Sequence, residues 1–495
     1  MTNPSERHAA IDPPSSGHDR LFGSRARSKI VATVGPACRA PSQLESLARA
    51  GVDVFRLNTA HGTPEAFATT IRDIRALEAR VGPLAILLDL AGPKIRLGSL
   101  DPDPYSCTRG ATVRFVRGTN GGPGELTTNY ERLIEELRVG DRIVLADGVV
   151  SLCVESKSSD YAECRVLDEG IVRGRQGVNL PGAQLMLPSL TDQDLEWVAW
   201  SVTADVDFLS LSFVRSAQDI RDLKTRLRAL EHKAAVIAKI EKPEALHDLE
   251  AIVEASDGLM VARGDLGVEI DVAEVPVAQK RIVELCNAWQ RPVIVATQML
   301  ESMHHAPRPT RAEATDVANA ILDGADACML SGETAVGEYP LAAVETMQRI
   351  MRATEVLFQD RTHGHRPHTS SHRIAHPSTH AVVYAAGRIA EELSAKLVVV
   401  ATRTGTTAVT KSNLRDFIPT IAVSDDPRVL RRMSLLWGII PIPGAPTRQR
   451  QELKEFVIAW GKQTGLLASR DLFVLIGGTL LFPDAHNQLV IYEVP

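Results

Sequence analysis

The sequence predicts an α/β protein: a closed (β/α)8 (TIM) barrel with a small β domain inserted into it and a smaller C-terminal α/β domain. Three observations lead to this fold class. The chain has 495 residues, enough for roughly three domains of about 150 residues each. Short runs rich in Val, Ile and Leu alternate with longer stretches of helical periodicity, as in parallel sheets covered by helices. One long interval interrupts this alternation.

The first element of the fold is a series of eight predicted strands, each followed by a helical stretch. They are Lys29–Gly35, Val52–Asn58, Leu84–Leu90, Asp207–Phe213, Ala235–Glu241, Gly258–Gly264, Pro292–Thr297 and Ala327–Gly332. Eight strands in this βα alternation favour a closed barrel over an open sheet. The barrel is therefore expected in two parts, residues 27–95 and 182–357.

The interrupting interval, residues 96–181, has the pattern of a separate β domain. Its apolar segments are short, and turn signals occur at Asn120-Gly121-Gly122 and Asp147-Gly148. Because it lies between the third and fourth predicted strands, we expect this domain to be inserted at the top face of the barrel.

The remaining segments complete the predicted domain organisation. Residues 1–26 mix Pro, Ser, His and both charge signs without an apolar core, which predicts a disordered tail and not a secretion signal. Residues 358–379 are rich in His, but irregular spacing and missing Cys or carboxylate partners favour an exposed linker over a metal site. Residues 380–495 form the C-terminal domain, with strands at Lys396–Thr402, Pro419–Ser424, Gly438–Pro443, Asp471–Gly478 and Gln488–Val494.

Composition excludes several classes of function. Asp plus Glu (61) exceed Lys plus Arg (55), so the net charge of −6 argues against a nucleic-acid partner. No uncharged apolar run reaches the roughly 18 residues that a bilayer requires, which argues against a membrane partner. The 6 cysteines include no C-x-x-C pair and are expected to be reduced and mostly buried, as in a cytoplasmic protein.

Polar residues cluster where the predicted barrel strands end, and in such barrels the functional groups lie at these carboxyl ends. Six ends contribute: Arg56, Asn58 and His61; Asp89, Lys94 and Arg96; Lys239 and Glu241; Arg263, Gly264, Asp265 and Gly267; Thr297 and Gln298; Ser331, Gly332 and Glu333. A single such residue is as easily a structural ion pair or helix cap. Convergence of six strand ends on one mouth predicts an active site.

The residue types at this mouth indicate phosphoryl chemistry. Carboxylates on adjacent strands, Glu241 and Asp265, can hold a hard cation such as Mg²⁺. Lys239 and the nearby arginines suit a phosphoryl group, whose oxygens need cations during transfer. Backbone N–H groups at Gly264 and Asp265 could bind a carboxylate if they open a helix. A Walker A loop is absent, because Gly405–Ser412 lacks the second glycine.

Long segments of the sequence match one known family. They are Ser28–Pro36 (SKIVATVGP), Arg56–Gly62 (RLNTAHG), Gly177–Gly182 (GVNLPG), Met260–Gly267 (MVARGDLG), Ala296–Met303 (ATQMLESM), Pro307–Glu313 (PRPTRAE) and Leu330–Ala335 (LSGETA). After the tail, the chain resembles pyruvate kinase along essentially its whole length.

The resemblance implies an enzyme, a phosphotransferase of glycolysis. It would transfer the phosphoryl group of phosphoenolpyruvate to ADP, giving ATP and an enolpyruvate that is protonated to pyruvate. It would use Mg²⁺ or Mn²⁺ and assemble in the cytoplasm as a homotetramer. The inserted β domain would be a small β-barrel acting as a mobile lid that closes over the mouth and excludes water.

The resemblance also implies roles for individual residues. On the phosphoryl side, Lys239 would contact the transferring group, Arg56 and Arg96 would bind phosphate, and Glu241 and Asp265 would hold the metal. The backbone of Gly264 and Asp265 would bind the substrate carboxylate. Thr297 would lie near the carbon that gains a proton, with Ser331 and Glu333 in the polar network around it. Asn58 and His61 would contact the nucleotide, and Asp147 would reach the site from the closed lid.

The sequence departs from the family at the monovalent-cation site. Asn58 and Asp89 remain, but Ala60 stands where the family has serine and Leu90 where it has threonine. In the same region, Lys94 replaces a glutamate. We expect the Lys94 ammonium to substitute for K⁺, so that K⁺ is not required. The alternative is a weakened or altered enzyme. Gln176, where a lysine is common, removes one charge near the lid hinge.

The C-terminal domain resembles the family's effector domain. The loop Thr402-Arg403-Thr404-Gly405-Thr406-Thr407 follows a strand, so its hydroxyls and N–H groups are candidates to hold a sugar-phosphate or nucleotide effector. An ordinary helix cap explains the same residues equally well. The segment Gly477–Gln488 departs from the family's glycine-rich loop and leaves the effector unidentified.

Two other functions compete with an active kinase. A Mg²⁺-dependent lyase would keep Glu241 and Asp265 but would need neither the nucleotide side nor the lid. Arg96 and the inserted domain argue against it. A non-enzymatic metabolite sensor would act through the C-terminal domain, and the intact Lys239 and Thr297 argue against that.

Overall fold

The computed structural model describes residues 25–118, 121–183, 186–362, 374–478 and 487–495. Most of the predicted tail (1–24), the centre of the predicted linker (363–373) and part of the predicted Asn120-Gly121-Gly122 turn lie outside these ranges. The described residues divide into two compact units: one lies within Ile30–Met347, and the other holds residues 25–29, 348–362, 374–478 and 487–495.

Eight parallel strands close into a barrel in the first unit, with neighbours in the order β1-β16-β15-β14-β13-β12-β3-β2. The strands are β1 (Lys29–Thr33), β2 (Val52–Asn58), β3 (Ala85–Asp89), β12 (Phe208–Leu211), β13 (Ala235–Ile240), β14 (Gly258–Ala262), β15 (Val293–Ala296) and β16 (Ala327–Leu330). Each lies within one of the eight predicted runs. The predicted barrel is therefore confirmed.

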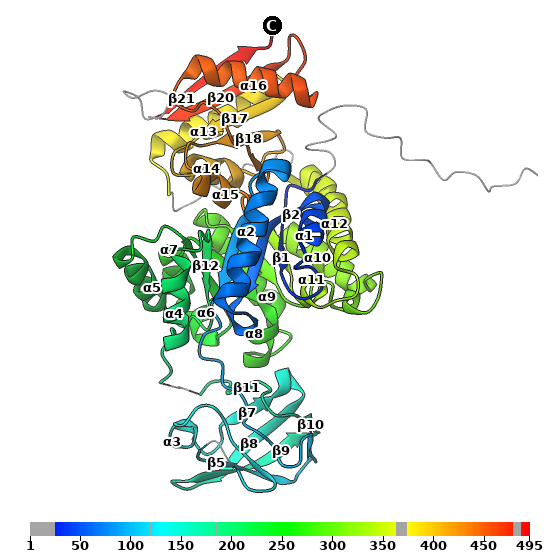
Figure 1. Cartoon of the computed structure of the whole chain (residues 1–495), viewed down its shortest axis with the longest axis vertical. Coiled ribbons are helices and arrows are strands. Elements are labelled where there is room, and N and C mark those ends of the chain that lie inside the picture. The colour runs from blue at the N-terminus through cyan, green and yellow to red at the C-terminus, as the bar shows by residue number, and fades with distance from the viewer. Residues whose placement is uncertain (1–24, 119–120, 184–185, 363–373, 479–486) are drawn as a thin grey trace, which may run out of the picture. The chain divides into compact units, whose positions relative to one another are not determined.

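Helices follow the strands and cover the barrel (Figure 1). They are α1 (Pro41–Ala50), α2 (Pro64–Val81), α4 (Asp192–Ser201), α5 (Ala217–Ala229), α6 (Pro243–His247), α7 (Leu249–Ala255), α8 (Arg263–Glu269), α9 (Val275–Ala288), α10 (Arg311–Asp323), α11 (Gly332–Ala335) and α12 (Pro340–Thr362). Local signals fix several starts: Pro64 follows the Thr63 cap of α2, and Thr310 with Glu313 forms a capping box on α10.

The strand register aligns the polar strand ends. Residues of β2 and β3 pair in parallel, so that Asn58 lies opposite Asp89. On the neighbouring pair, Lys239 of β13 lies opposite Met260 of β14, which places Glu241 and Asp265 just beyond the two strand ends. Because all eight strands are parallel, the side chains that follow them gather at one end of the barrel.

The inserted domain is all-β, as predicted. A six-stranded sheet has the order β11-β7-β8-β9-β5-β6, and a two-stranded sheet pairs β10 with β4. The strands are β4 (Tyr105–Cys107), β5 (Thr112–Val116), β6 (Glu125–Leu126), β7 (Arg142–Leu145), β8 (Val150–Lys157), β9 (Tyr161–Asp168), β10 (Gly170–Val172) and β11 (Val178–Asn179), with one short helix, α3 (Leu133–Glu136). The predicted turn at residues 147–148 falls in a 3-10 helix, η3 (Ala146–Gly148), where Gly148 has a φ of 103°.

The second unit contains a five-stranded sheet in the order β19-β18-β17-β20-β21, in which only β21 is antiparallel to its neighbour. Its strands are β17 (Leu397–Ala401), β18 (Thr420–Val423), β19 (Ile439–Pro441), β20 (Leu472–Gly478) and β21 (Asn487–Glu493). The helices are α13 (Pro377–Glu392), α14 (Thr406–Asn413), α15 (Pro427–Met433) and α16 (Arg450–Thr464). This is the predicted C-terminal α/β domain.

The predicted linker, residues 358–379, differs from the structure at both ends. Helix α12 continues to Thr362, and α13 begins at Pro377. One physical reason is the aromatic side chain of Phe358, whose ring lies 6.1 Å from that of Phe417 and extends the buried side of α12. Composition alone did not reveal this contact, because the surrounding residues are polar.

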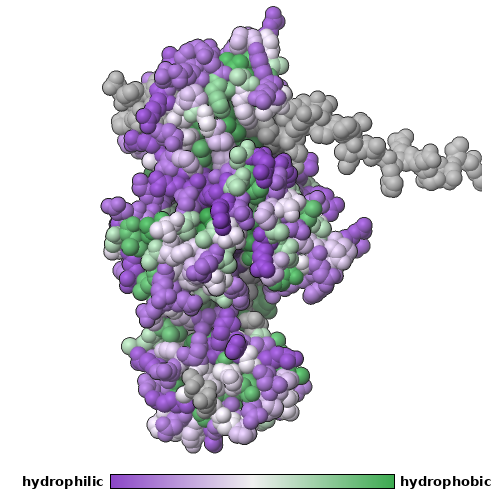
Figure 2. Space-filling model, in the orientation of Figure 1, coloured by the Kyte–Doolittle hydropathy of each residue, from purple (hydrophilic) through white to green (hydrophobic). Residues whose placement is uncertain are grey.

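Two expectations about the whole chain can be compared with the structure. All six cysteines are free, and five of them are buried. No helix in the described ranges is long and apolar enough to cross a membrane. Figure 2 shows a face on which hydrophilic residues predominate and hydrophobic ones occur in small groups.

Candidate active site

A cavity of about 610 Å³ opens at the carboxyl ends of the barrel strands. Its lining contains nine residues to which the sequence assigned a role: Arg56, Asn58, His61, Asp89, Lys94, Arg96, Lys239, Glu241 and Asp265. They come from segments that are far apart in the chain but adjacent in the barrel. The predicted convergence of strand ends on one mouth is thus present for these residues.

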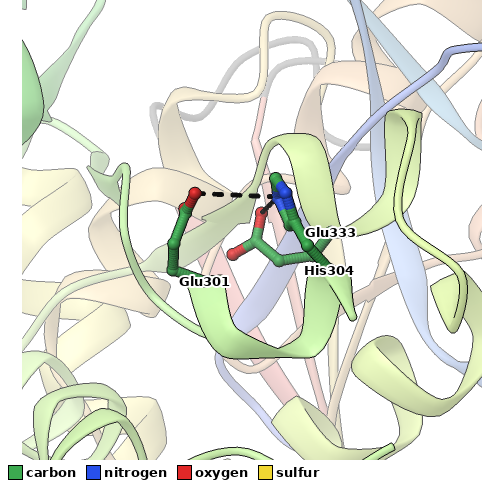
Figure 3. Close-up of side chains that lie close together, drawn as sticks. All are labelled: Glu301, His304 and Glu333. Carbon is green, nitrogen blue, oxygen red and sulfur yellow. Dashed lines mark ion pairs between the residues drawn. The ribbon is translucent and has the colours of Figure 1, made fainter. Parts of the chain in front are cut away.

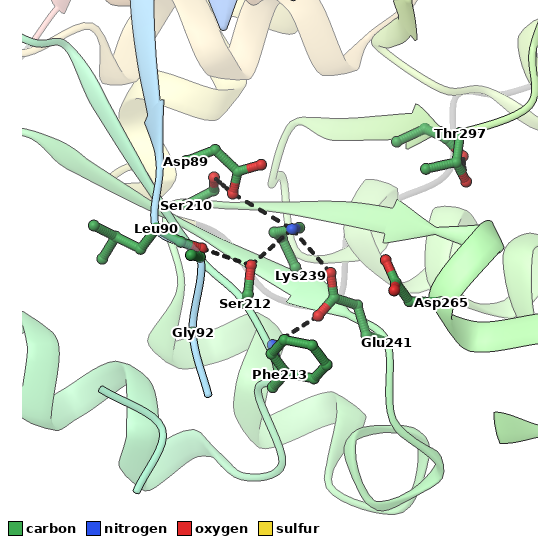
Figure 4. A network of polar contacts seen from close by, with 12 residues as sticks. Asp89, Leu90, Gly92, Ser210, Ser212, Phe213, Lys239, Glu241, Asp265 and Thr297 are labelled. Atoms are coloured by element: carbon green, nitrogen blue, oxygen red, sulfur yellow. Dashed lines mark hydrogen bonds and ion pairs between the residues drawn. The ribbon is translucent and has the colours of Figure 1, made fainter. Parts of the chain in front are cut away.

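Lys239 is the centre of a buried polar network in this cavity (Figure 4). Its Nζ donates to Ser212 Oγ at 2.7 Å and lies 2.9 Å from Glu241 Oε1 and 3.4 Å from Asp89 Oδ1. Burial alone would lower the pKa of Lys239, but the two carboxylates outweigh it and raise that pKa. Lys239 is therefore a permanent cation held in one orientation.

Arg56 is fixed against the same network. Its Nε donates to Asp89 Oδ2 at 2.7 Å, and its Nη1 donates to Thr33 Oγ1 at 2.9 Å. Ser210 Oγ donates to the other Asp89 oxygen at 2.6 Å. Burial would raise the pKa of Asp89, but Lys239 and Arg56 hold it below its ordinary value. Asp89 thus stays ionised and orients two cations.

Glu241 and Asp265 are suited to a divalent cation. Glu241 is almost completely buried, and its Oε2 accepts the N–H of Phe213 at 2.8 Å. Burial raises the pKa of Glu241, and the nearby charge of Asp265 raises it further, against the effect of Lys239. The two carboxylates repel each other, and a bound Mg²⁺ or Mn²⁺ would relieve this repulsion by taking their oxygens as ligands. The residues therefore fit the cofactor that the sequence implied.

Lys94 lies beside this carboxylate pair. Its Nζ is 3.3 Å from Asp265 Oδ1. The sequence placed Lys94 near Asn58 and Asp89, and all three line the cavity together with Ala60 and Leu90. The ion pair of Lys94 in this structure, however, is with Asp265.

Thr297 and Gly264 contact each other and do not line the cavity. Gly264 is the second residue of α8, and its N–H donates to Thr297 Oγ1 at 2.7 Å. Thr297 and Gln298 have φ values of 66° and 55°. Thr297 is β-branched, and such a residue adopts a positive φ only when its surroundings force it. Arg263 supplies part of that force, because its Nη2 donates to the Thr297 carbonyl at 2.8 Å and its Nη1 to Asp316 Oδ1 at 2.7 Å.

Ser331 and Glu333 lie after β16 and do not line the cavity. Glu333 is fully buried, and its oxygens accept the N–H groups of Leu300 at 3.1 Å and Ser331 at 2.7 Å. Burial raises the pKa of Glu333, and these hydrogen bonds offset part of that effect. Ser331 Oγ is buried without a hydrogen-bond partner in the described ranges. The hydrogen bonds of Glu333 thus go to Leu300 and Ser331 and not to Thr297.

The residues assigned to the nucleotide lie at the outer edge of the cavity. Asn58 uses its side-chain oxygen to accept the N–H of Ala60 at 3.1 Å. Partial burial and the positive charges of Arg96, Arg56 and Lys94 lower the pKa of His61. Asp147 belongs to η3, and its side chain lies outside what the structure describes.

Sequence reasoning missed three groups of this site. Ser210 and Ser212 fix Asp89 and Lys239, and Thr33 fixes Arg56. A signal was available for the two serines, because they are two residues apart in the predicted fourth strand and so share a face. Nothing in the sequence distinguishes Thr33 from the other threonines near strands.

The candidate effector loop borders a smaller cavity in the second unit, of about 230 Å³. Thr402, Arg403, Thr404, Thr406 and Thr407 line it, and Gly405 is the left-handed residue before α14. Thr402 Oγ1 accepts the Gly405 N–H at 3.0 Å, so part of the loop caps itself.

Known proteins resemble the chain throughout. The family models described as pyruvate kinase, barrel domain, and pyruvate kinase, alpha/beta domain, match residues 25–344 and 380–492. A pyruvate kinase of Agrobacterium vitis is 40% identical over 467 residues, covering 93% of this chain and 96% of the relative. One of Mycobacterium tuberculosis is 42% identical over 421 residues, covering 83% and 86%. The crystal structure of a pyruvate kinase from Cryptosporidium parvum matches with a TM-score of 0.87 and 33% identity, covering 96% and 98%.

Proposed function

Since the chain belongs to the pyruvate kinase family of phosphotransferases, we propose that it transfers the phosphoryl group of phosphoenolpyruvate to ADP without needing a monovalent cation. The observation that carries the proposal is the buried network around Lys239, which holds two cations and two carboxylates in one cavity. Such a site stabilises charge on a phosphoryl group, because the cations are already oriented before transfer begins.

In this proposal Lys239 and Arg56 bind the oxygens of the transferring group. Both are held by Asp89, so they do not reorganise as the phosphoryl group moves from the enol oxygen to ADP and the enol oxygen gains negative charge. Arg96, in the same cavity, adds a third positive charge. These cations lower the barrier, and proton transfer is not required of them.

Glu241 and Asp265 would hold the divalent cation, Mg²⁺ or Mn²⁺. When bound, this ion supplies further positive charge to the phosphoryl oxygens. Asn58 and His61 would contact ADP at the outer edge of the cavity. His61 would do so as a neutral ring near pH 7, because its pKa is lowered.

The enolpyruvate product gains its proton near Thr297. The backbone N–H groups of Gly264 and Asp265 would bind the substrate carboxylate, and Thr297 would lie next to the carbon that is protonated. The Gly264 N–H donates to Thr297 Oγ1 in the described structure. Substrate binding would therefore redirect this hydrogen bond and leave the Thr297 hydroxyl available.

Lys94 takes the place of K⁺ in this mechanism. Ala60 and Leu90 offer no side-chain oxygen to a monovalent ion, and Lys94 brings an ammonium group to the same cavity. Its ion pair with Asp265 supports an electrostatic role next to the phosphoryl site. When a divalent cation takes Asp265, the flexible Lys94 side chain is free to turn toward Asn58 and Asp89.

The test is the rate of pyruvate formation with Mg²⁺ as KCl is raised from zero, in a buffer free of K⁺, Na⁺ and NH₄⁺. We expect the wild type to reach its full rate at zero KCl. The variant Lys94→Glu should lose about tenfold or more without K⁺ and recover with it. Leu90→Thr is a matched control in the same cavity that keeps the ammonium.

The possible results of this assay distinguish the active kinase from the lyase and the sensor. Activity of the wild type only with K⁺ would retain the kinase and reject the role of Lys94. No pyruvate or ATP under any salt would favour the lyase or the sensor.

A further inference from the structure

Three metal-ligating side chains converge beside the barrel end, outside the cavity described above (Figure 3). Glu301 and His304 belong to the 3-10 helix η4 (Glu301–His304), which follows β15, and Glu333 belongs to α11, which follows β16. His304 Nε2 lies 3.9 Å from Glu301 Oε1 and 4.0 Å from Glu333 Oε2. The three ligand atoms all lie within 4.8 Å of one another.

The imidazole of His304 is already seated for coordination. Gly332 leaves room for the ring, because a Cβ at that position would lie 2.1 Å from Cε1 and 2.2 Å from Nε2 of His304. Nε2 is buried and has no hydrogen-bond partner among the described residues. It points between the two carboxylates in Figure 3. A buried ring nitrogen without a partner calls for an explanation such as an ion.

Glu333 and Glu301 complement each other as ligands. Glu333 is held rigidly by the N–H groups of Leu300 and Ser331, and Oε2 retains a second lone pair. The Glu301 side chain is 54% exposed, so it can move toward an ion. The helix that carries Glu301 and His304 is anchored, because Ser302 donates its N–H to Glu313 Oε1 at 2.7 Å.

We propose that Glu301, His304 and Glu333 bind one divalent transition-metal ion, with Zn²⁺ as the best match. One imidazole nitrogen and two carboxylate oxygens form a set that suits Zn²⁺, whereas Mg²⁺ prefers oxygen ligands alone. Ligands about 2.0–2.2 Å from one tetrahedral ion lie roughly 3.4 Å apart. The separations of 3.9 and 4.0 Å therefore close with small shifts, led by Glu301.

The bound ion joins two loops that otherwise meet through a few hydrogen bonds. One loop follows β15 and carries Thr297, and the other follows β16 and carries Ser331. Cross-linking them stabilises the folded chain, since the ion binds the folded state and not the unfolded one. A water molecule completes the coordination.

Zinc binding to the whole chain tests the proposal. After removal of metals by a chelator, Zn²⁺ is titrated calorimetrically into the Asp265→Asn variant with excess Mg²⁺, so that the active-site carboxylates do not compete. We expect one equivalent of Zn²⁺ per chain. Adding His304→Gln should weaken the affinity at least about 100-fold, because a direct ligand is lost.

A matched control is available in the neighbouring histidine. His305→Gln removes an exposed imidazole that pairs with Glu338 Oε1 at 3.0 Å, and it should leave the zinc affinity unchanged. Glu301→Gln, at an exposed position that does not endanger folding, should weaken the affinity about tenfold or more. With Co²⁺ in place of Zn²⁺, the intense visible bands of a tetrahedral ion should appear and should vanish in His304→Gln.

Two results would overturn the proposal. One is the absence of a Zn²⁺ equivalent in Asp265→Asn under these conditions. The other is equal zinc affinity in Glu301→Gln, His304→Gln and their parent. In either case the three side chains form an ordinary polar cluster that holds no metal ion.

Discussion

At the scale of single residues, a few buried side chains fix the positions of the charged groups in the cavity. Asp89 is the clearest example, because it binds Arg56 directly and lies within 3.4 Å of Lys239. Removing the Asp89 carboxylate from water costs free energy, and its attraction to the two cations offsets that cost. The same arrangement fixes the orientation of both cations toward the cavity.

The pH dependence of stability should report on Asp89. Its pKa is lower in the folded chain than in the unfolded chain, so its ion pairs add stability above the unfolded pKa, and this is lost as pH falls through the folded value. We expect Asp89→Asn to lower the unfolding free energy by about 3–5 kcal/mol at neutral pH. The difference from wild type should shrink below about pH 4.

Denaturant unfolding at several pH values measures this difference. Asp160→Asn, on an exposed turn of the inserted domain, serves as the control and should change little at any pH. A difference between wild type and Asp89→Asn that stays constant from neutral to acid pH would show that Asp89 is not ionised in the folded chain.

At the scale of elements, the loops after β14 and β15 act together. Arg263, the first residue of α8, donates to the carbonyls of Ala296 and Thr297 and to Asp316 of α10. This single side chain connects three elements and supports the positive φ of Thr297. Arg263 is therefore a positioning residue for the proton-transfer end of the site.

Replacing Arg263 should affect chemistry more than binding. We expect Arg263→Met to lower kcat about tenfold or more with little change in the KM for ADP, because Thr297 moves while the nucleotide side does not. It should also slow the enzyme-catalysed exchange of pyruvate methyl protons with solvent. Arg281→Met, at an exposed position of α9, is the control. A purely structural role would lower Tm but leave the exchange rate per folded molecule unchanged.

The loop before α14 allows a prediction about regulation. Thr404 and Thr406 hydroxyls lie 3.0 Å apart at the cavity of about 230 Å³, where a phosphate would accept from both. We expect a sugar phosphate or a nucleotide to bind there, with glucose 6-phosphate and AMP as the two probes, and the double variant Thr404→Ala, Thr406→Ala to weaken that binding about tenfold.

Calorimetry with each compound checks the effector site. Thr464→Ala, on α16 and outside the cavity lining, is the control. Failure of both compounds to bind the wild type, or equal binding by the double variant, would leave the loop as a helix cap only.

At the scale of the whole molecule, some apolar side chains remain uncovered in the single chain. Val272 and Val277, near the start of α9, are 77% and 69% exposed. Neighbouring apolar side chains that face solvent are common at subunit interfaces. The homotetramer that the resemblance implied stays a prediction, and these two valines are candidates for its interface.

Light scattering on the purified chain should give about four times the chain mass of 53.7 kDa, independent of dilution through the micromolar range. Val272→Glu with Val277→Glu should shift the mass downward. A monomeric wild type at these concentrations would reject the tetramer.

Much of the fold and part of the site were predictable from local sequence signals. The eight barrel strands were identified because each is a short apolar run buried on both faces and bounded by polar residues. Glu241, Asp265 and Lys239 were identified because residues at strand ends of a parallel barrel share one mouth. The composition of the predicted linker did not reveal that α12 continues to Thr362 and that α13 begins at Pro377.

The sequence by itself thus determined the fold class, the strand ends and the residue types at the mouth, since these follow from periodicity and local composition. Only the tertiary structure decided the pairs: Lys239 with Ser212, Lys94 with Asp265, and His304 with Glu333. The reason is physical. Hydrogen bonds and ion pairs depend on separations of about 3–4 Å between side chains distant in the chain, and the register and packing of the whole barrel set those separations.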